Sequence, residues 1–360
     1  MANKILYSFW GYLSDKPGIS SPDGNFSYSW SILQEFQKRG WDTIAVMDRD
    51  KEIVQSLGKE AFKSFSMDKR YNVYKKTKFL NSFHDLPQVD LVLLENRFPT
   101  KDNTKNPDEL GYSPDLAIQN TILNRYKDTP IVLWDLDNKV TEDESRFYKV
   151  IETSIKPKKG RERVYIPFDF SEILQFPLRE VNLCKRLVYC GNDYERRKDI
   201  ETKIVPYSIK YPFTVQFFGN WMKDEKKELR DKWNKISFNG RIDAQGFRPS
   251  LEGAVASPLL ATEDYKERGH MTMRLLESIL FGSIPLGFSD FTGINAFLPK
   301  ELIVDMNDYE KSMERKMGNL FSNGKAYREE LRANLSTDLS YQHDAKYFVD
   351  KLLGEGHGQK

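Results

Sequence analysis

The sequence is poor in cysteine and histidine, and it lacks any long apolar run. Among its 360 residues there are two cysteines, Cys184 and Cys190, and four histidines. This number and spacing predict neither a disulfide framework nor a zinc site, and they are typical of a reducing compartment. No segment reaches the roughly 18 to 20 uninterrupted apolar residues that cross a bilayer. We therefore expect a cytoplasmic protein with no membrane partner.

The chain also lacks a large excess of charge of either sign. The 55 lysines and arginines nearly balance the 53 aspartates and glutamates, and the net charge of +2 argues against a uniformly basic nucleic-acid coat. Two local clusters are basic nevertheless, and such clusters can neutralise phosphates. A solvated loop or helix face is the simpler explanation for either cluster alone. The candidate phosphate-binding residues in them are Lys75, Lys76, Lys156, Lys158, Lys159 and Arg161.

The sequence does contain enough apolar material for two folded domains. Hydrophobic residues make up 39% of the chain, and its length exceeds the roughly 250 to 300 residues at which one core stops growing. Short apolar runs alternate with helical patterns, as in parallel folds whose strands are buried on both faces. The runs form a first series at 5–10, 42–47, 89–95 and 131–136, and a second at 187–190, 213–218, 236–238, 255–260, 284–286 and 302–304.

This pattern predicts an α/β protein with two Rossmann-like domains. We expect the first domain at residues 1–180 and the second at residues 181–338. A helical pattern within residues 339–360 follows the second series and has no strand after it. We therefore expect this last helix to pack back toward the first domain.

Ligands of open parallel sheets bind beyond the carboxyl ends of the strands, so the residues there are the site candidates. Gly191 and Asn192 follow directly after a strand-like run, and Arg196 and Arg197 come next. A glycine allows the backbone to approach a ligand closely, and two guanidinium groups suit a diphosphate. A glycine turn before a helix that begins with charged residues explains the same pattern equally well.

Two further strand ends carry glycine. Gly219 follows the run at 213–218, and Gly240, Arg241 and Ile242 come shortly after the run at 236–238. Each most simply forms a turn. The backbone at Arg241 and Ile242 could also hydrogen-bond the edge of a base.

The most specific segment contains His270, Arg274 and Glu277. Glu277 follows Arg274 by three positions, so both lie on one face of the helix predicted at residues 272–281. A cation there can meet a phosphate, while a carboxylate one turn further accepts two ribose hydroxyls. His270 is close enough along the chain to touch a phosphate. An ordinary intrahelical ion pair is the simpler alternative.

This helix, with the glycine-bounded strand at 282–287 after it, resembles the donor-binding helix of GT-B glycosyltransferases. Within that class the chain resembles the phage DNA β-glucosyltransferases, which transfer glucose from UDP-glucose to hydroxymethylcytosine in duplex DNA. The resemblance implies a GT-B fold, in which two Rossmann-like domains face each other across a cleft. Matching local patterns occur in order at residues 91–96, 114–118, 188–191, 217–220 and 240–242, and at Arg274 with Glu277.

The same resemblance implies a role for each donor-site candidate. Arg274 would hold a donor phosphate and Glu277 the ribose, while Ile242 would meet the edge of the uracil through its backbone. These contacts recognise UDP and leave the sugar open. The donor would therefore be UDP-glucose or UDP-arabinose, and the enzyme a hexosyl- or pentosyltransferase.

The diphosphate would also contact Gly191 together with an arginine. The spacing of the arginines differs from the spacing in the family, which leaves the choice between Arg196, Arg197 and Lys198 open.

For catalysis the family uses an aspartate after the fourth strand, as the general base that deprotonates the acceptor hydroxyl. Asp135 and Asp137 both stand at this place. We prefer Asp137, because Asp135 can orient it or cap the following turn. The Asp-X-Asp triplet also suits a divalent ion, Mg²⁺ or Mn²⁺, that bridges the diphosphate; we rank this second because the arginine sites already neutralise that group. A capped strand end is the structural alternative for either residue.

The acceptor would be duplex DNA that carries the hydroxymethylated base. That base reaches a catalytic cleft only if it flips out or the groove opens, so we expect the basic clusters to bind DNA beside the cleft. Gly11, Asp23 and Gly24 could shape the sugar or acceptor pocket. We expect a monomer, in the host cytoplasm if a phage encodes it. A glycosyltransferase for a cell-surface glycan or lipid precursor, and a nucleotide-binding protein without transferase activity, are the competing hypotheses.

Overall fold

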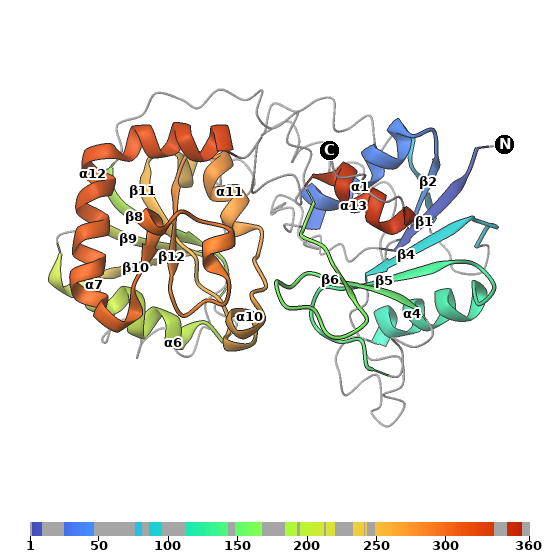
Figure 1. The fold of residues 1–360 in the computed structure, drawn as a ribbon, viewed down its shortest axis with the longest axis horizontal. Helices are drawn as coiled ribbons and strands as arrows, with labels where there is room; N and C mark the ends of the chain where they lie inside the picture. Colours follow the sequence, from blue (N-terminus) through green and yellow to red (C-terminus); the bar gives the residue numbers. More distant parts are fainter. Residues whose placement is uncertain are drawn as a thin grey trace. The chain divides into compact units, whose positions relative to one another are not determined.

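The structure of the protein is a computed structural model, in which the chain divides into two compact units (Figure 1). The first unit comprises Met1–Asp169 with Gln342–Lys360, and the second comprises Phe170–Tyr341. The divisions predicted from the sequence fall at residues 180 and 338. The structure describes residues 2–8, 25–46, 76–80, 86–95, 113–142, 148–167, 184–192, 195–211, 214–219, 233–240, 242, 249–334 and 344–354.

The described part of the first unit contains one parallel sheet with the strand order β3-β2-β1-β4-β5-β6-β7. The chain runs from β1 outward to β2 and β3, then returns to the other side of β1 to form β4 and β5. This reversal is the topological switch point of a Rossmann-like sheet. The strands are β1 Lys4–Ser8, β2 Asp42–Val46, β3 Lys78–Leu80, β4 Leu91–Glu95, β5 Ile131–Asp135, β6 Lys149–Glu152 and β7 Glu162–Arg163.

Helices cover both faces of this sheet, which is why the central strands read as continuous apolar runs. Helix α1 (Asn25–Lys38) and α13 (Ala345–Leu353) lie on one face, and α4 (Ser113–Arg125) lies on the other (Figure 1). Every residue of β4 and of β5 is buried. Gly40, with a φ of 79°, adopts the left-handed conformation that ends α1 and leads into β2.

The last helix is an integral part of the first unit. Helix α13 packs on α1, and the fully buried Phe348 lies against Trp134 of β5 with ring centroids 4.8 Å apart. Tyr28 of α1 contacts the same indole from an edge at 5.2 Å. Trp134 is therefore held between two helices that are more than 300 positions apart in the sequence. It directly precedes Asp135.

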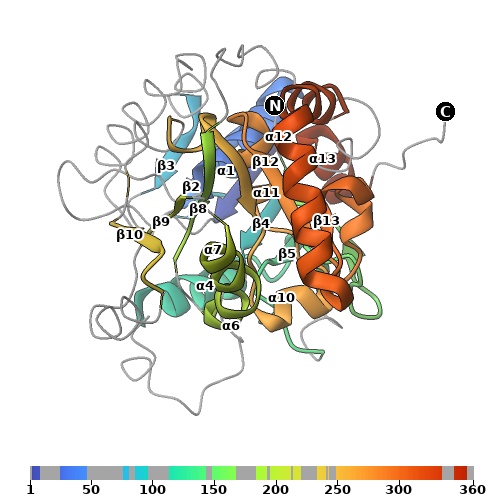
Figure 2. The same cartoon turned by 90° about the vertical axis from the view of Figure 1, so that its left-hand side faces the viewer.

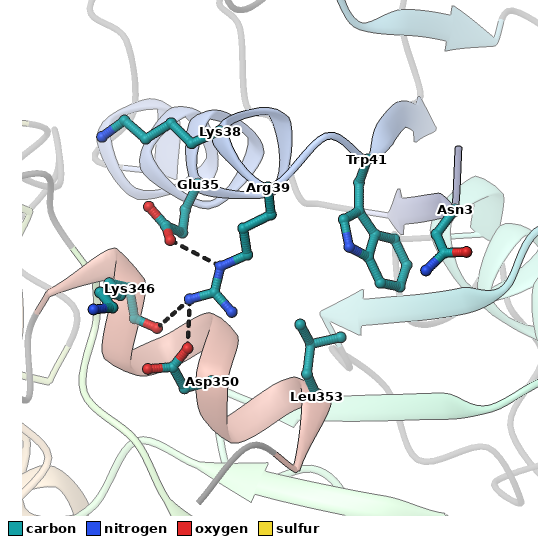
Figure 3. A pocket seen from close by; sticks show the side chains of 8 residues that line it. All are labelled: Asn3, Glu35, Lys38, Arg39, Trp41, Lys346, Asp350 and Leu353. Carbon is teal, nitrogen blue, oxygen red and sulfur yellow. Dashed lines mark hydrogen bonds and ion pairs between the residues drawn. The ribbon is translucent and has the colours of Figure 1, made fainter. Parts of the chain in front are cut away.

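An arginine ties the same two helices together at their edge. Arg39, at the end of α1, donates to Asp350 of α13 at 2.5 Å and to the carbonyl of Lys346 at 3.2 Å, while it pairs with Glu35 at 2.9 Å. Figure 3 shows these bonds beside an open groove of about 660 Å³. Asn3 and Trp41 line the groove from the amino ends of β1 and β2. It therefore lies at the edge of the sheet opposite to the one where ligands of such folds bind.

The described part of the second unit repeats the architecture, with the parallel order β10-β9-β8-β11-β12-β13 and the switch point at β8. The long helix α12 packs against α11 and the strands β11, β12 and β13 (Figure 2). The strands are β8 Cys184–Cys190, β9 Thr214–Phe218, β10 Ile236–Asn239, β11 Ala254–Pro258, β12 Ile284–Phe288 and β13 Ile303–Val304. The helices are α6 Arg197–Asp199, a π-helix Ile200–Ile204, α7 Val205–Lys210, α10 Glu263–Arg268, α11 Arg274–Leu280 and α12 Tyr309–Asn334, with 3-10 turns at Ile294–Ala296, Lys300–Leu302 and Met306–Asp308.

The predicted fold class, α/β with two Rossmann-like sheets, is confirmed. The apolar runs at 131–136 and 284–286 correspond to β5 and β12, and the helix predicted at 272–281 corresponds to α11. The short strands β3, β6 and β7 were not predicted, because β3 and β6 mix charged with apolar residues and β7 consists of two charged residues. None of the helices in the described ranges is long and apolar enough to cross a membrane.

The contact between Phe348 and Trp134 predicts a strong dependence of the first unit on α13. Phe348→Ala should lower the free energy of unfolding by about 3 to 5 kcal/mol, because it leaves a cavity in a closed core. Tyr347→Ala, a half-buried position on the same helix, is the matched control and should cost far less. Urea denaturation followed by tryptophan fluorescence measures both. Equal losses would show that α13 only covers the surface.

Candidate functional site

The carboxyl ends of β8, β9 and β10 lie side by side, and each is followed by a glycine. The backbone N–H of Gly191 donates to the carbonyl of Phe218 at 2.8 Å, and that of Gly219 donates to the carbonyl of Gly240 at 3.3 Å. These bonds continue the strand pairing past the end of the sheet. They bring three backbone turns together at the edge where ligands of such sheets bind.

Two of these glycines cannot carry a side chain. A Cβ atom on Gly219 would lie 2.0 Å from the carbonyl oxygen of Gly191, and Gly219 has a φ of 148°. A Cβ atom on Gly191 would lie 2.7 Å from the hydroxyl of Tyr189. Among the described residues, no atom lies within 4 Å of such a position on Gly240. Close backbone packing therefore requires the glycine at 219, and the buried Tyr189 side chain requires the one at 191, whereas Gly240 marks only a turn.

Helix α11 begins with the arginine and glutamate predicted to bind the donor. Arg274 forms an ion pair with Glu277 one turn further on, so the intrahelical pair considered as an alternative exists in this structure. The Arg274 side chain is 31% exposed and that of Glu277 is 12% exposed. The pair is therefore partly buried, and the arginine is the more exposed of the two side chains.

Two arginines from separate segments converge on the end of β8. Burial raises the pKa of the Tyr189 hydroxyl, and the positive charges of Arg196 and Arg274 oppose this rise. Burial also raises the pKa of the Cys190 thiol to about 12, again against the charge of Arg274. Arg274 is thus close to the last two residues of β8 and Arg196 is close to Tyr189, which is the position expected for a diphosphate site.

Arg196 has one nitrogen that is bonded and one that lacks a partner among the described residues. Its Nη1 atom donates to the carbonyl of Asn192 at 3.0 Å. Its buried Nε atom has no hydrogen-bond partner among the residues that the structure describes. A buried guanidinium nitrogen without a partner costs free energy unless another group supplies an acceptor. An anionic ligand would supply one.

The other candidates of the second unit have diverse surroundings. Arg197 is 40% exposed and pairs with Glu201 at 3.6 Å. Ile242 packs against the apolar cluster that contains Val188 and Cys190, so it lies near the end of β8. His270 is buried, and its ring stacks on Tyr265 with centroids 4.2 Å apart. Asn192 is half-buried, and Arg241 lies outside the described residues.

In the first unit, Asp135 ends β5 and is completely buried. Its carboxylate accepts hydrogen bonds from the backbone N–H groups of Lys139 at 2.6 Å and Val140 at 3.2 Å, and from Arg161 at 2.7 Å. Burial raises the pKa of Asp135, and the amide of Lys139 and the charge of Arg161 oppose the rise. Asp135 therefore caps the turn after β5, as one of the sequence-based interpretations described.

Arg161 requires a correction. We had placed it among the DNA-binding residues because it stands in a basic run, but its side chain is only 1% exposed. It pairs with Asp135 at 2.7 Å and with Glu152 at 3.3 Å, and it donates to the carbonyl of Val140 at 2.7 Å. No part of the guanidinium is left for a phosphate, so we remove Arg161 from the proposed DNA surface.

Asp137 stands two positions beyond Asp135 in the turn after β5 and is half-buried. The next residue, Asn138, has the left-handed φ of 60°, which asparagine tolerates better than most residues. Asp137 is thus the more accessible of the two carboxylates.

The remaining candidates of the first unit divide by exposure. Lys76, Lys156, Lys158 and Lys159 are exposed, as a phosphate contact requires. The residues whose placement the structure does not describe are Lys75, Gly11, Asp23 and Gly24.

The metal hypothesis concerns the Asp-X-Asp pair, Asp135 and Asp137. Within the described ranges, no three histidine, cysteine, aspartate or glutamate side chains gather into a group that could hold a metal ion. Asp135 does not fit a metal ligand, because both of its oxygens are engaged by Arg161 and by backbone amides.

Sequence analysis missed a buried carboxylate at the end of β4. Glu95 is 4% exposed and accepts hydrogen bonds from the hydroxyls of Tyr7 at 2.5 Å and Tyr28 at 3.4 Å. A charged residue that closes an apolar run was the available signal. The contacts with tyrosines from β1 and α1 could not be seen without the fold.

The close approach at the strand ends predicts different tolerance of two neighbouring glycines. Gly219→Ala should destabilise the second unit by at least about 1 to 3 kcal/mol, the usual cost of a disfavoured backbone conformation, because the new methyl group also meets the Gly191 carbonyl. Gly240→Ala is the matched control and should be nearly neutral. Thermal and urea unfolding of both variants test this. Equal stability of the two would contradict the packing described.

Comparison with known proteins identifies the fold. No protein-family model and no curated protein sequence matches the chain. Among solved structures, that of the DNA-modifying enzyme β-glucosyltransferase, determined with and without uridine diphosphoglucose, has 14% identity and a TM-score of 0.61 and covers 98% of this chain and 99% of its own. T4 phage β-glucosyltransferase in complex with UDP and Mn²⁺ also has 14% identity and a TM-score of 0.61, over 97% and 99%.

Glycosyltransferases of other kinds match as well. HepE of Anabaena, in complex with UDP and glucose, has 14% identity and a TM-score of 0.54 over 98% of this chain and 99% of its own. AviGT4, a glycosyltransferase involved in avilamycin A biosynthesis, has 10% identity and a TM-score of 0.53 over 98% and 97%. The predicted resemblance is confirmed at the level of structure: the chain has the GT-B fold of these glycosyltransferases.

Proposed function

We propose that the protein is a glycosyltransferase that moves a sugar from a UDP-sugar to the hydroxyl of a hydroxymethylated pyrimidine, hydroxymethylcytosine, in duplex DNA. The observation that carries the proposal is the convergence of Arg196 and Arg274 on the end of β8, with Glu277 one helical turn from Arg274. Two cations beside a carboxylate suit a diphosphate attached to a ribose.

Donor binding would replace hydrogen bonds that the side chains of the site now make with one another. Arg274 would exchange its bond to Glu277 for a phosphate oxygen, and Glu277 would then accept from the ribose hydroxyls. The Nε atom of Arg196 would gain the acceptor that it lacks among the described residues. The N–H of Gly191 is already bonded to Phe218, so Gly191 would contribute close approach rather than a donated hydrogen bond.

The uracil would lie beside Ile242, which packs on the end of β8. Its backbone would pair with the edge of the base, and the side chain would stay in the apolar cluster. In this arrangement the protein recognises UDP, and the sugar is chosen elsewhere. UDP-glucose and UDP-arabinose are therefore both donors to be tested.

For the chemical step, Asp137 would accept the proton of the acceptor hydroxyl while that oxygen attacks the anomeric carbon and the bond to UDP breaks. The two arginines would stabilise the negative charge that develops on the leaving diphosphate. Asp135 would take no part in proton transfer, because Arg161 and two amides already use its oxygens. It would hold the turn that carries Asp137.

The DNA acceptor is supported by the exposed lysines of the first unit, Lys76, Lys156, Lys158 and Lys159. The similarity to a DNA-modifying enzyme over nearly the whole chain points the same way. Such an enzyme would act on a base flipped out of the duplex. We propose that it acts as a cytoplasmic monomer. The matches to HepE and AviGT4 make another acceptor, such as a glycan or lipid precursor, the main competing outcome.

Mass spectrometry of DNA tests this function directly. Duplex DNA with hydroxymethylcytosine, incubated with the protein and UDP-glucose or UDP-arabinose, should gain the mass of one hexose or pentose per modified base. Duplex DNA with unmodified cytosine is the matched control and should gain nothing. Parallel reactions with Mg²⁺, Mn²⁺ or chelator address the metal. If the folded protein binds UDP but adds no sugar from any donor, the DNA acceptor is wrong.

The two aspartates should respond differently to the same substitution. Asp137→Asn should lower kcat by roughly 10²- to 10⁴-fold, the usual contribution of a general base, and leave UDP affinity unchanged. Asp135→Asn should instead lower stability by about 3 to 5 kcal/mol, because Arg161 loses a buried partner. Transfer assays, UDP titration and urea unfolding separate these effects. Full activity of Asp137→Asn would remove it as the base.

A further inference from the structure

A cluster of four charged side chains, three of them buried, lies beyond the carboxyl ends of β11 and β12. We call Asp199, Lys203, Lys266 and Asp290 the charge cluster. The side chains of Lys203, Asp199 and Lys266 are 1%, 2% and 7% exposed, and that of Asp290 is 33% exposed. Two positive and two negative groups make the cluster neutral as a whole, which burial of charge requires.

Asp199 is the centre of this cluster. One of its oxygens accepts from Lys203 at 2.8 Å and from Lys266 at 2.8 Å, and the other accepts from the backbone N–H of Ala261 at 3.1 Å. Asp290 also bonds to both lysines, at 2.9 and 3.2 Å. Without Asp199, the two buried ammonium groups would keep only partly or largely exposed carboxylates: Asp290 for both lysines, and Glu263 at 2.9 Å for Lys266.

The members of the charge cluster come from separate segments. Asp199 ends α6 and Lys203 lies in the π-helix after it, Lys266 lies in α10, and Asp290 follows β12. Figures 1 and 2 both show α6 beside α10. The ion pairs therefore fasten the segment after β8 to the segment after β11.

Each of the two fastened segments leads into the candidate donor site. Asp199 is three positions after Arg196 on the same turn, where the N–H of Ile200 donates to the Arg196 carbonyl at 3.1 Å. From Lys266 the chain continues through Gly269, in the left-handed conformation, and into α11 at Arg274. The ion pairs of the charge cluster thus connect the segment that carries Arg196 with the segment that leads to Arg274.

We propose that Asp199 is a positioning residue of the donor site: it sets the spacing between Arg196 and Arg274, and through it the recognition of the diphosphate. The inference rests on the proposed function and adds a residue to it. Asp199 would touch neither donor nor acceptor, because its bonds among the described residues go to the two lysines and to Ala261. Its effect should therefore fall on the phosphate contacts and spare the contacts to the nucleoside.

The test compares the affinities of UDP and uridine by calorimetry. Asp199→Asn should weaken UDP binding by roughly 10- to 100-fold, the scale expected when charged contacts shift by about 1 Å. Uridine, which lacks phosphates, should bind as to the wild type. Asp264→Asn, which removes an exposed ion pair with Arg268 within α10, is the matched control and should change neither affinity.

A second variant keeps the test decisive if Asp199→Asn does not fold. Asp199→Asn with Lys266→Met removes one of the two ammonium groups that lose Asp199, and Lys203 keeps Asp290 at 2.9 Å. This double variant should fold and still bind UDP more weakly than the wild type, with unchanged uridine affinity. Wild-type UDP affinity in a folded variant, or equal losses for UDP and uridine, would overturn the positioning role. A wild-type protein that binds neither compound would overturn the proposed function together with this inference.

Discussion

In each unit, a buried aspartate beyond a strand end is held by cations and by backbone amides. In the first unit Asp135 meets Arg161 and two N–H groups, and in the second Asp199 meets two lysines and the N–H of Ala261. A carboxylate that leaves water must recover its interactions within the protein, so these bonds are strict and directional. They fix the segments in which the more exposed candidate groups stand. The proposed chemistry depends on that rigidity.

Buried residues that fix the structure stand close along the chain to the residues proposed to contact the substrates. Asp137 stands two positions from Asp135, and Arg196 stands three positions from Asp199. In both cases the buried residue has all of its described bonds within the protein. The neighbouring candidate is accessible, as Asp137 is, or has a nitrogen without a described partner, as Arg196 does. In this structure Arg274 and Glu277 bind each other, so a diphosphate and a ribose would have to displace this ion pair.

Much of the fold could be predicted from the sequence, because strands of a parallel sheet are buried on both faces and read as short apolar runs. The spacing of Arg274 and Glu277 was equally readable, since three positions make one helical turn. The sequence did not reveal which charged side chains point into the protein. Arg161 stands in a run that resembles a solvated basic surface, and only the buried carboxylates of Asp135 and Glu152 explain why it turns inward.

Contacts between distant segments account for the rest of what the sequence did not reveal. Asp199 and Lys266 are 67 positions apart, and nothing local to either marks them as partners. The glycines make the same point. Gly219 and Gly240 both follow strands and both neighbour an asparagine, yet only Gly219 lies against another backbone. That difference depends on strand packing, which local sequence does not encode.

A structure of the protein with bound UDP would test the central claim most directly. The account predicts that the diphosphate lies at the carboxyl ends of β8 and β9 against the guanidinium of Arg274, and that Glu277 releases Arg274 and accepts from the ribose hydroxyls. A nucleotide bound at another edge of the sheet, or bound there with the pair between Arg274 and Glu277 intact, would contradict it.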